Sequence, residues 1–356
     1  MGNFWKPDWD TVRARHIAWW EHTGFVVSTQ APADHPHAAV AKPASPETLE
    51  QAWITPEYRA RKAEYELSQT YFGGEAFPYF DAHIGPGSLA LMLGSRASYT
   101  DESVWYEACL DDLENAPPLR FDPDDLWFRR HVALLEYGMA ISEGRFLVGM
   151  PDLIENMDTL ASLRGAETLM FDLIEQPDVI KRMIREINQV YFEVFSALHQ
   201  IIRDAWGGNA FSAFRIWGPG KTGKVQCDAS AMFSPRMFAA FVVPALAEQC
   251  AWLDYSMYHL DGTQAVVHLD QLLEIEALDA IEWTPQAGIE TGGSPRWYPL
   301  YRRILDAGKS VQAVGVLPDE VLPLLDATGG TGMFIIADAQ TEAQARSLTE
   351  AVERLR

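Results

Sequence analysis

Two residues that can do chemistry follow an apolar run in the last third of the chain. His259 and Asp261 come directly after residues 255–258, and Gly262 ends the run. Side chains on a strand alternate between its two faces, so His259 and Asp261 would point to one side, about 6–7 Å apart. An imidazole and a carboxylate in this arrangement can share a metal ion or a proton. The same pattern also fits a core histidine followed by a turn-forming aspartate.

Polar and aromatic residues recur at the ends of the other expected strands. The full set is Asp81, His83, Asp152, Trp217, His259, Asp261, Glu282, Trp283 and Asp338. Helix capping accounts equally well for Asp152 and Asp338 taken singly. His259, Asp261 and Glu282 come from neighbouring strands, and we expect them to form the catalytic group. Among the others, we expect Asp81, His83 and Asp152 to bind substrate.

The residue types around His259 suit a divalent metal. Imidazole and carboxylate ligands are typical of zinc, manganese or iron(II), and an open coordination position would polarise a bound hydroxyl, ether or thiol. The expected ligands are His259, Asp261, Glu282 and Cys227, with zinc as the expected ion. Cys227 also fits a small buried hydrophobic residue. Without a metal, His259 and Asp261 would act as a general acid and its orienting partner.

Residues 215–224 concentrate three cations in an acidic protein. Arg215, Lys221 and Lys224 alternate with glycines, which let backbone amides approach a ligand closely. This pattern predicts that Lys221 and Lys224 clamp an anionic substrate, although a solvated surface loop has the same composition. The aromatic residues at strand ends, Trp217, Tyr258 and Trp283, suit a flat or apolar substrate and equally suit core packing.

Composition limits the class of protein. The 356 residues are 48% hydrophobic and 12% aromatic, enough for a large core. A formal charge of −22 disfavours nucleic acid and anionic membrane surfaces as partners. Three cysteines without CxxC spacing exclude a disulfide framework, and the first residues lack the pattern of a secretory signal. We therefore expect a cytoplasmic protein that acts on a small molecule.

Eight expected strands alternate with helices. The strands are 24–29, 76–83, 145–150, 211–217, 255–259, 279–283, 310–315 and 332–337. This alternation, without a GxGxxG or GxxxxGK[ST] motif, predicts an α/β fold: a single (β/α)₈ TIM-type barrel domain over residues 1–356 with an amino-terminal helical extension. In such barrels the catalytic residues lie at the carboxyl ends of the strands, which is where the polar set above is found.

One block of sequence resembles a known superfamily. Residues 233–244, Phe-Ser-Pro-Arg-Met-Phe-Ala-Ala-Phe-Val-Val-Pro, followed by Tyr-His-Leu-Asp-Gly at 258–262, are similar to the central block of the uroporphyrinogen decarboxylase superfamily. That superfamily includes porphyrinogen decarboxylases and zinc methyltransferases that move methyl groups between corrinoid proteins and thiols or other acceptors. The resemblance extends from Gly24 to the end of the chain and implies a TIM-type barrel.

The chain departs from both branches of that superfamily. The methyltransferases place a His-x-Cys pair where this chain has His259 and Asp261, and they have a further cysteine where residues 337–340 have none. The Arg-Gln-Ala-Gly-Arg stretch of the decarboxylases is also missing. The resemblance implies a metal-dependent methyltransferase with a corrinoid protein as methyl donor or acceptor. A metal-independent decarboxylase or lyase and a non-catalytic small-molecule-binding barrel are the alternatives.

Overall fold

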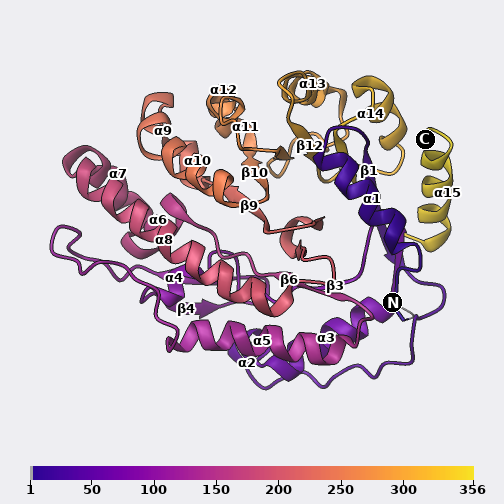
Figure 1. Ribbon diagram of the computed structural model, residues 1–356, viewed down its shortest axis with the longest axis horizontal. Coiled ribbons are helices and arrows are strands. Elements are labelled where there is room, and N and C mark those ends of the chain that lie inside the picture. Colours follow the sequence, from indigo (N-terminus) through magenta and orange to yellow (C-terminus); the bar gives the residue numbers. More distant parts are fainter. Residues whose placement is uncertain (1–2) are drawn as a thin grey trace.

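The larger of two main sheets carries most of the parallel strands (Figure 1). The computed structural model describes residues 3–356; residues 1 and 2, part of the predicted domain, lie outside the described range. The seven-stranded sheet has the order β2-β1-β13-β12-β11-β10-β9, and only β1 and β2 pair antiparallel. Its strands are β1 (Val26–Pro32), β2 (Thr70–Gly74), β9 (Thr222–Gln226), β10 (Tyr255–Asp261), β11 (Ala280–Thr284), β12 (Ser310–Ala313) and β13 (Met333–Ile336).

The smaller sheet completes the set of parallel strands. It has the order β3-β6-β7-β8, in which β3, β6 and β7 are parallel and β8 runs antiparallel to β7. A separate antiparallel ribbon is formed by β4 and β5. The bounds are β3 (Tyr79–Phe80), β4 (Arg96–Tyr99), β5 (Val104–Glu107), β6 (Leu147–Met150), β7 (Asn209–Phe211) and β8 (Ile216–Gly218).

The closed ring of eight strands expected from the sequence is not formed by the backbone hydrogen bonds of residues 3–356. The two sheets remain separate ladders, so the structure is a mixed α/β fold with a largely parallel sheet. Between β7 and β9 a side chain takes the place of the ladder: Asn209 accepts from the Thr222 amide at 3.0 Å and donates to the Thr222 carbonyl at 2.9 Å. These bonds satisfy strand-edge groups that would otherwise be buried without partners.

Helices connect the strands and cover the sheets. In Figure 1, α3, α5 and α8 lie along one side, and α9 to α14 lie along the opposite side. The helices are α1 (Trp9–Trp20), α2 (Leu49–Ile54), α3 (Pro56–Ser68), α4 (Leu89–Met92), α5 (Leu126–Ser142), α6 (Asn156–Arg164), α7 (Ala166–Glu175), α8 (Pro177–Ile202), α9 (Pro235–Phe241), α10 (Val243–Trp252), α11 (Gly262–Ala265), α12 (Leu269–Leu273), α13 (Tyr298–Asp306), α14 (Val321–Thr328) and α15 (Glu342–Glu353), with short 3₁₀ turns η1 (Ser212–Phe214), η2 (Asp228–Met232), η3 (Val266–His268) and η4 (Pro295–Trp297).

The amino-terminal helix α1 lies across the amino ends of the strands. Trp19 Nε1 donates to the carbonyl of Gly332, the residue before β13, at 3.0 Å. Trp20 Nε1 donates to the carbonyl of Trp217 at 2.9 Å, and both indoles are buried. Burial of an indole with its N–H satisfied combines a large apolar contact with a hydrogen bond. The predicted helical extension therefore closes the end of the sheet opposite to His259.

The region from residue 211 to 228 differs from its predicted form. The expected strand 211–217 is a hairpin of β7 and β8, because the chain reverses through η1 and Arg215, which has a left-handed backbone with φ of 55°. The expected loop that follows contains a fully buried strand, β9. Its sequence, Thr-Gly-Lys-Val-Gln, lacks the apolar run that identifies a buried strand. No helix within residues 3–356 has the length and apolarity needed to span a membrane.

Candidate functional site

The candidate site is organised by the carboxyl end of β10. The parallel register places His259 beside Glu282 of β11 on one side and beside Gln226 of β9 on the other. Asp261, the last residue of β10, is exposed, whereas the His259 side chain is 14% exposed. The predicted adjacency of His259, Asp261 and Glu282 is thus present in the structure, at the end of the sheet that α1 leaves open.

Glu282 contacts one nitrogen of His259. The Glu282 side chain is fully buried, and its Oε2 accepts a hydrogen bond from His259 Nδ1. A carboxylate only accepts, so this contact puts the proton on Nδ1 and leaves Nε2 for a metal ion or a substrate. Thr284 Oγ1 donates to the other oxygen of Glu282 at 2.6 Å. Burial opposes a charge on His259, but the Glu282 carboxylate outweighs it and raises the pKa of His259.

Asp228, the first residue of η2, completes a group that could hold a metal ion. Ligand atoms of Asp228, His259 and Asp261 all lie within 4.8 Å of one another. Asp228 is exposed, but partial desolvation and then the neighbouring Asp158 raise its pKa to about 6, against the opposing effect of His259 and Lys224. One imidazole and two carboxylates suit zinc, manganese or iron(II). The donor set therefore fits a divalent ion.

A cavity of about 670 Å³ opens beside this group. His259 and Asp228 are among its polar lining residues, and Trp105, Tyr106 and Phe214 are its aromatic ones. The Phe214 ring lies 4.9 Å from the His259 ring, centroid to centroid. Gln312, the register neighbour of Glu282 on β12, donates through Nε2 to the Phe214 carbonyl at 2.9 Å. This bond ties the η1 turn to the sheet and fixes one wall of the cavity.

Lys224 is buried behind the cavity. Its side chain is fully buried, and Nζ lies 2.8 Å from Oδ1 of Asp152, which lines the cavity. Burial opposes the Lys224 charge, but Asp152 and Glu155 outweigh it, so the pKa of Lys224 is raised. Burial also raises the pKa of Glu155 to about 8, against the opposing effect of Lys224. Lys224 is therefore engaged by internal carboxylates and does not line the cavity as the predicted anion clamp.

Lys221 lies at the other end of the sheet. It precedes β9, whereas His259 is in register with Gln226, the last residue of that strand, about 16 Å further along. Lys221 Nζ donates to the Trp252 carbonyl at 2.7 Å and lies 3.9 Å from the Trp252 ring centroid. Arg215 pairs with Asp338 at 2.8 Å. Residues 215–224 do not form a cationic loop over the cavity.

Asp81 and His83 line a second cavity, of about 430 Å³. It lies at the end of β3, between that strand and helices α2 and α3. Asp81 Oδ1 accepts from Ser212 Oγ at 2.7 Å, and His83 Nδ1 is 3.8 Å from the same oxygen. The structure therefore separates these predicted substrate-binding residues from His259.

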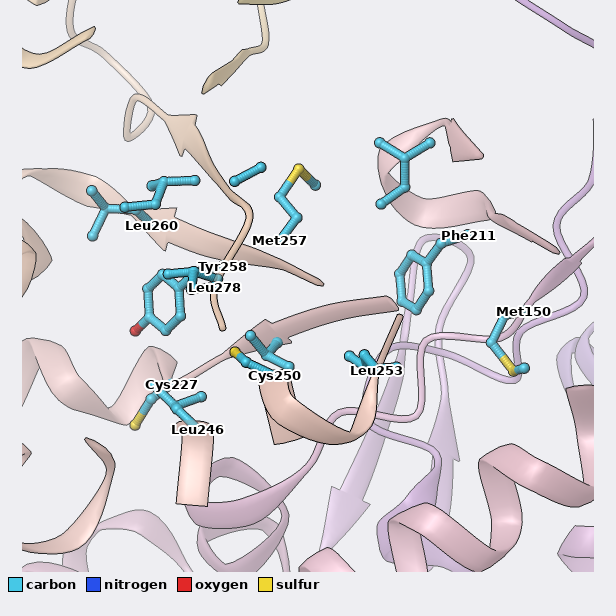
Figure 2. Packing of buried hydrophobic residues seen from close by; sticks show 14 of the residues in the cluster. Met150, Phe211, Cys227, Leu246, Cys250, Leu253, Met257, Tyr258, Leu260 and Leu278 are labelled. Carbon is cyan, nitrogen blue, oxygen red and sulfur yellow. The ribbon is translucent and has the colours of Figure 1, made fainter. Parts of the chain in front are cut away.

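The remaining predicted residues lie in the core. Trp217 and Trp283 are fully buried, and Tyr258 and Cys227 are 1% and 2% exposed. Trp217 Nε1 donates to Asp204 Oδ2 at 2.7 Å. Figure 2 shows Cys227 and Tyr258 among apolar side chains, and burial raises the pKa of Cys227 well above its usual value. Neither Cys227 nor Glu282 belongs to the group of close ligand atoms formed by Asp228, His259 and Asp261.

Several residues of the site were not among the predicted ones. Asp228, Asp158, Gln226 and Phe214 all line the cavity. Asp158 Oδ2 accepts from the Asp228 amide at 2.7 Å, which positions the start of η2. The sequence signal was the carboxylate that follows Cys227, which would have stood out if residues 222–226 had been predicted as a strand.

Comparisons with known proteins find a likeness in structure alone. No protein-family model matches the chain, and no curated protein matches it. Among solved structures, a methyltransferase from Methanosarcina mazei is similar over 97% of this chain and 98% of its own length. The TM-score is 0.59 and the sequence identity is 13%. The chain therefore shares the overall fold of that methyltransferase.

Proposed function

We propose that this protein is a metal-dependent methyltransferase of the uroporphyrinogen decarboxylase superfamily, with one domain over residues 1–356 that is an opened (β/α)₈ barrel. The observation that carries the proposal is the group of Asp228, His259 and Asp261 beside a cavity, with Glu282 buried behind His259. The fold shared with a methyltransferase supports the reaction class. By the superfamily resemblance, a corrinoid protein is the methyl donor or acceptor.

In this proposal His259 Nε2 and the carboxylates of Asp228 and Asp261 hold the ion, with zinc as the first choice. The ion supplies a Lewis acid that lowers the charge density of a substrate heteroatom. Glu282 holds the imidazole in the tautomer with the proton on Nδ1. Gln312 holds the Phe214 backbone through its carbonyl and so keeps the Phe214 ring beside His259.

A second candidate function rests on the same His259–Glu282 contact. A histidine with a raised pKa beside a buried carboxylate is suited to donate a proton near neutral pH, as a metal-independent decarboxylase or lyase requires. Chelation separates the two. Activity that survives exhaustive removal of metal and is lost as His259 deprotonates favours the lyase. A protein that binds ligand without turnover, in the wild type and in His259→Ala alike, is the non-catalytic barrel.

The proposal is tested by the metal content of purified protein after supplementation. We expect about one divalent ion per chain in the wild type and a loss of most of it in His259→Ala. His83→Ala is the matched control, because His83 also ends a parallel strand and lines a cavity. It should keep the wild-type metal content. Unchanged stoichiometry in His259→Ala, or a wild type that binds no ion, contradicts the proposal.

A further inference from the structure

The charges around the cavity beside His259 are almost all negative. Its charged lining residues are Asp152, Asp158, Asp228 and His259, and within residues 3–356 no lysine or arginine lines it. The cations that the sequence suggested for this cavity lie elsewhere. Lys221, for example, donates to the Trp252 carbonyl. Apart from Lys224, which is buried behind the wall and paired with Asp152, no cation offsets these carboxylates, so the cavity repels an anionic substrate.

Two of these carboxylates have internal or proposed counter-charges, and Asp158 has none. Lys224 balances Asp152, and the proposed metal ion would balance Asp228 and Asp261. Asp158 accepts only from neutral donors: Gln226 Nε2 at 3.0 Å and the amides of Asp228 and Ala229 at 2.7 and 3.0 Å. Its negative charge therefore remains at the cavity wall when the metal site is filled.

Aromatic rings form the other part of the wall. Trp105 of β5 is 66% exposed at the cavity, and its neighbour Tyr106 is held by a 2.8 Å hydrogen bond from its hydroxyl to the Ile84 carbonyl. Phe214 completes the set from η1. Aromatic faces attract cations, and aromatic walls combined with carboxylates are the usual recognition elements for methylated ammonium groups. Small apolar residues, Ala161 and Ala213, also line the cavity and take up little of its space.

We propose that the cavity beside His259 binds a substrate that carries a methylated ammonium group, with its methyl groups against the aromatic rings and its charge toward Asp158. This inference rests on the proposed function in that it names the substrate class of the same site. The cavity beside His83 would not serve, because Arg59 and Lys62 line it together with carboxylates. The aromatic rings and the carboxylates of the first cavity would recognise this group with or without the proposed metal ion.

Binding of three probes of nearly equal shape tests it by isothermal titration calorimetry. Choline carries the ammonium group, tert-butylethanol replaces its nitrogen with carbon, and 3,3-dimethylbutanoate is a carboxylate anion with the same tert-butyl group. We expect choline to bind at least about tenfold more tightly than tert-butylethanol, the effect of a desolvated cation–π contact with an added carboxylate. Choline binding should weaken with salt, and tert-butylethanol binding should not.

Variants of the exposed Trp105 keep the test independent of folding. Trp105→Leu should lower choline affinity about three- to tenfold without changing tert-butylethanol affinity, and Trp105→Phe should retain most of the preference. Trp53→Leu is the control, since Trp53 lines the other cavity. Asp158→Asn should weaken choline binding and abolish its salt dependence.

Equal binding of choline and tert-butylethanol, tighter binding of 3,3-dimethylbutanoate, or no binding of any probe overturns the inference. Metal content measured on the same preparations separates it from the proposed function. A preference for choline in a protein that binds no metal leaves the substrate class standing and removes the methyltransferase proposal. A protein that binds metal but shows no preference for choline leaves the methyltransferase proposal standing and removes the proposed substrate class.

Discussion

The cavities beside His259 and His83 present the same two residue types at the end of a parallel strand. His259 and Asp261 end β10, and Asp81 and His83 follow β3 with the same spacing. In the first cavity, the histidine contacts a buried glutamate and lies within 4.8 Å of two carboxylates. In the second, the nearest side-chain partners are Asp81, 3.8 Å from His83, and the Trp53 ring, 5.6 Å away.

The difference comes from the chain segments that face each strand end. Two segments beside β10 supply the partners of His259. Glu282 comes from β11, and Asp228 comes from the turn after β9. At β3, Arg59 donates to the carbonyls of Asp81 and His83 at 2.9 Å each, so its guanidinium fixes the backbone of the strand end. A histidine and a carboxylate at a strand end therefore gain a metal-binding geometry only when neighbouring strands add further ligands.

The largest expected effect concerns one lysine near each cavity: Lys224, buried behind the first, and Lys62, which lines the second. Lys224→Ala should lower the free energy of unfolding by about 3–5 kcal/mol, because it leaves Asp152 buried without its ion-pair partner. Lys62→Ala, at a half-exposed lysine of the other cavity, should change it by less than about 0.5 kcal/mol. Urea unfolding measures both. Similar losses in the two variants would mean that the buried Lys224–Asp152 pair contributes no more to the free energy of unfolding than an exposed lysine does.

The next effect concerns the carboxylate behind each histidine. Glu282→Gln should weaken metal binding about 10- to 100-fold, because an amide no longer fixes the Nδ1 proton of His259 as a carboxylate does. Asp81→Asn, the corresponding change at His83, should alter metal affinity less than about twofold. Competition with a chromophoric chelator measures both constants. A Glu282→Gln protein with wild-type affinity would make Glu282 a packing residue and remove the main difference between the cavities.

The sequence predicted most of the parallel strands because they are apolar runs. Strands β1, β6 and β10 to β13 coincide with predicted ones to within a few residues. Strand β9 escaped prediction because its buried residues include Gly223 and Lys224, and Lys224 is tolerated there only through Asp152, which is distant in sequence. The separation of the strands into two sheets instead of one closed ring likewise depends on contacts between distant residues, such as the Asn209 side chain with the Thr222 backbone.

The candidate site was predictable to the extent that it is local. Strand alternation brings His259 and Asp261 to one side, and adjacency of β10 and β11 adds Glu282. The role of Glu282 as a partner of His259 Nδ1, and the arrival of Asp228, depend on register and on a turn that no local pattern specifies. The charge of Lys221 indicated an anion site, but a charge pattern does not reveal which end of a strand a residue occupies.

The smallest expected effect contrasts the protonation of histidines in the two regions. His131 lies behind the second cavity, where Nδ1 donates to the Trp127 carbonyl at 2.7 Å and Nε2 accepts from Ser88 Oγ at 2.9 Å. Burial, partly opposed by the bond to Trp127, lowers the pKa of His131 to about 4. This is opposite in direction to His259, whose pKa is raised. The surroundings of His131 and His259 therefore favour opposite charge states of the imidazole.

That contrast predicts how stability depends on pH. The pKa of His131 falls from about 6.5 in the unfolded chain to about 4 in the fold, so between these values the unfolded chain binds the extra proton. Stability from this group is complete above pH about 6.5 and declines toward pH 4, by about 2 kcal/mol between pH 7 and pH 5. His131→Gln should reduce the pH-dependent loss in urea unfolding by that amount, whatever its effect on absolute stability.

His35→Gln, at an exposed histidine, is the control and should leave the dependence of stability on pH unchanged. The buried His16, with a pKa of about 4, contributes a loss of the same sign to every variant and cancels in the comparison. An unchanged slope in His131→Gln would mean that His131 takes up its proton in the folded protein as readily as in the unfolded chain, and the contrast between His131 and His259 would then disappear.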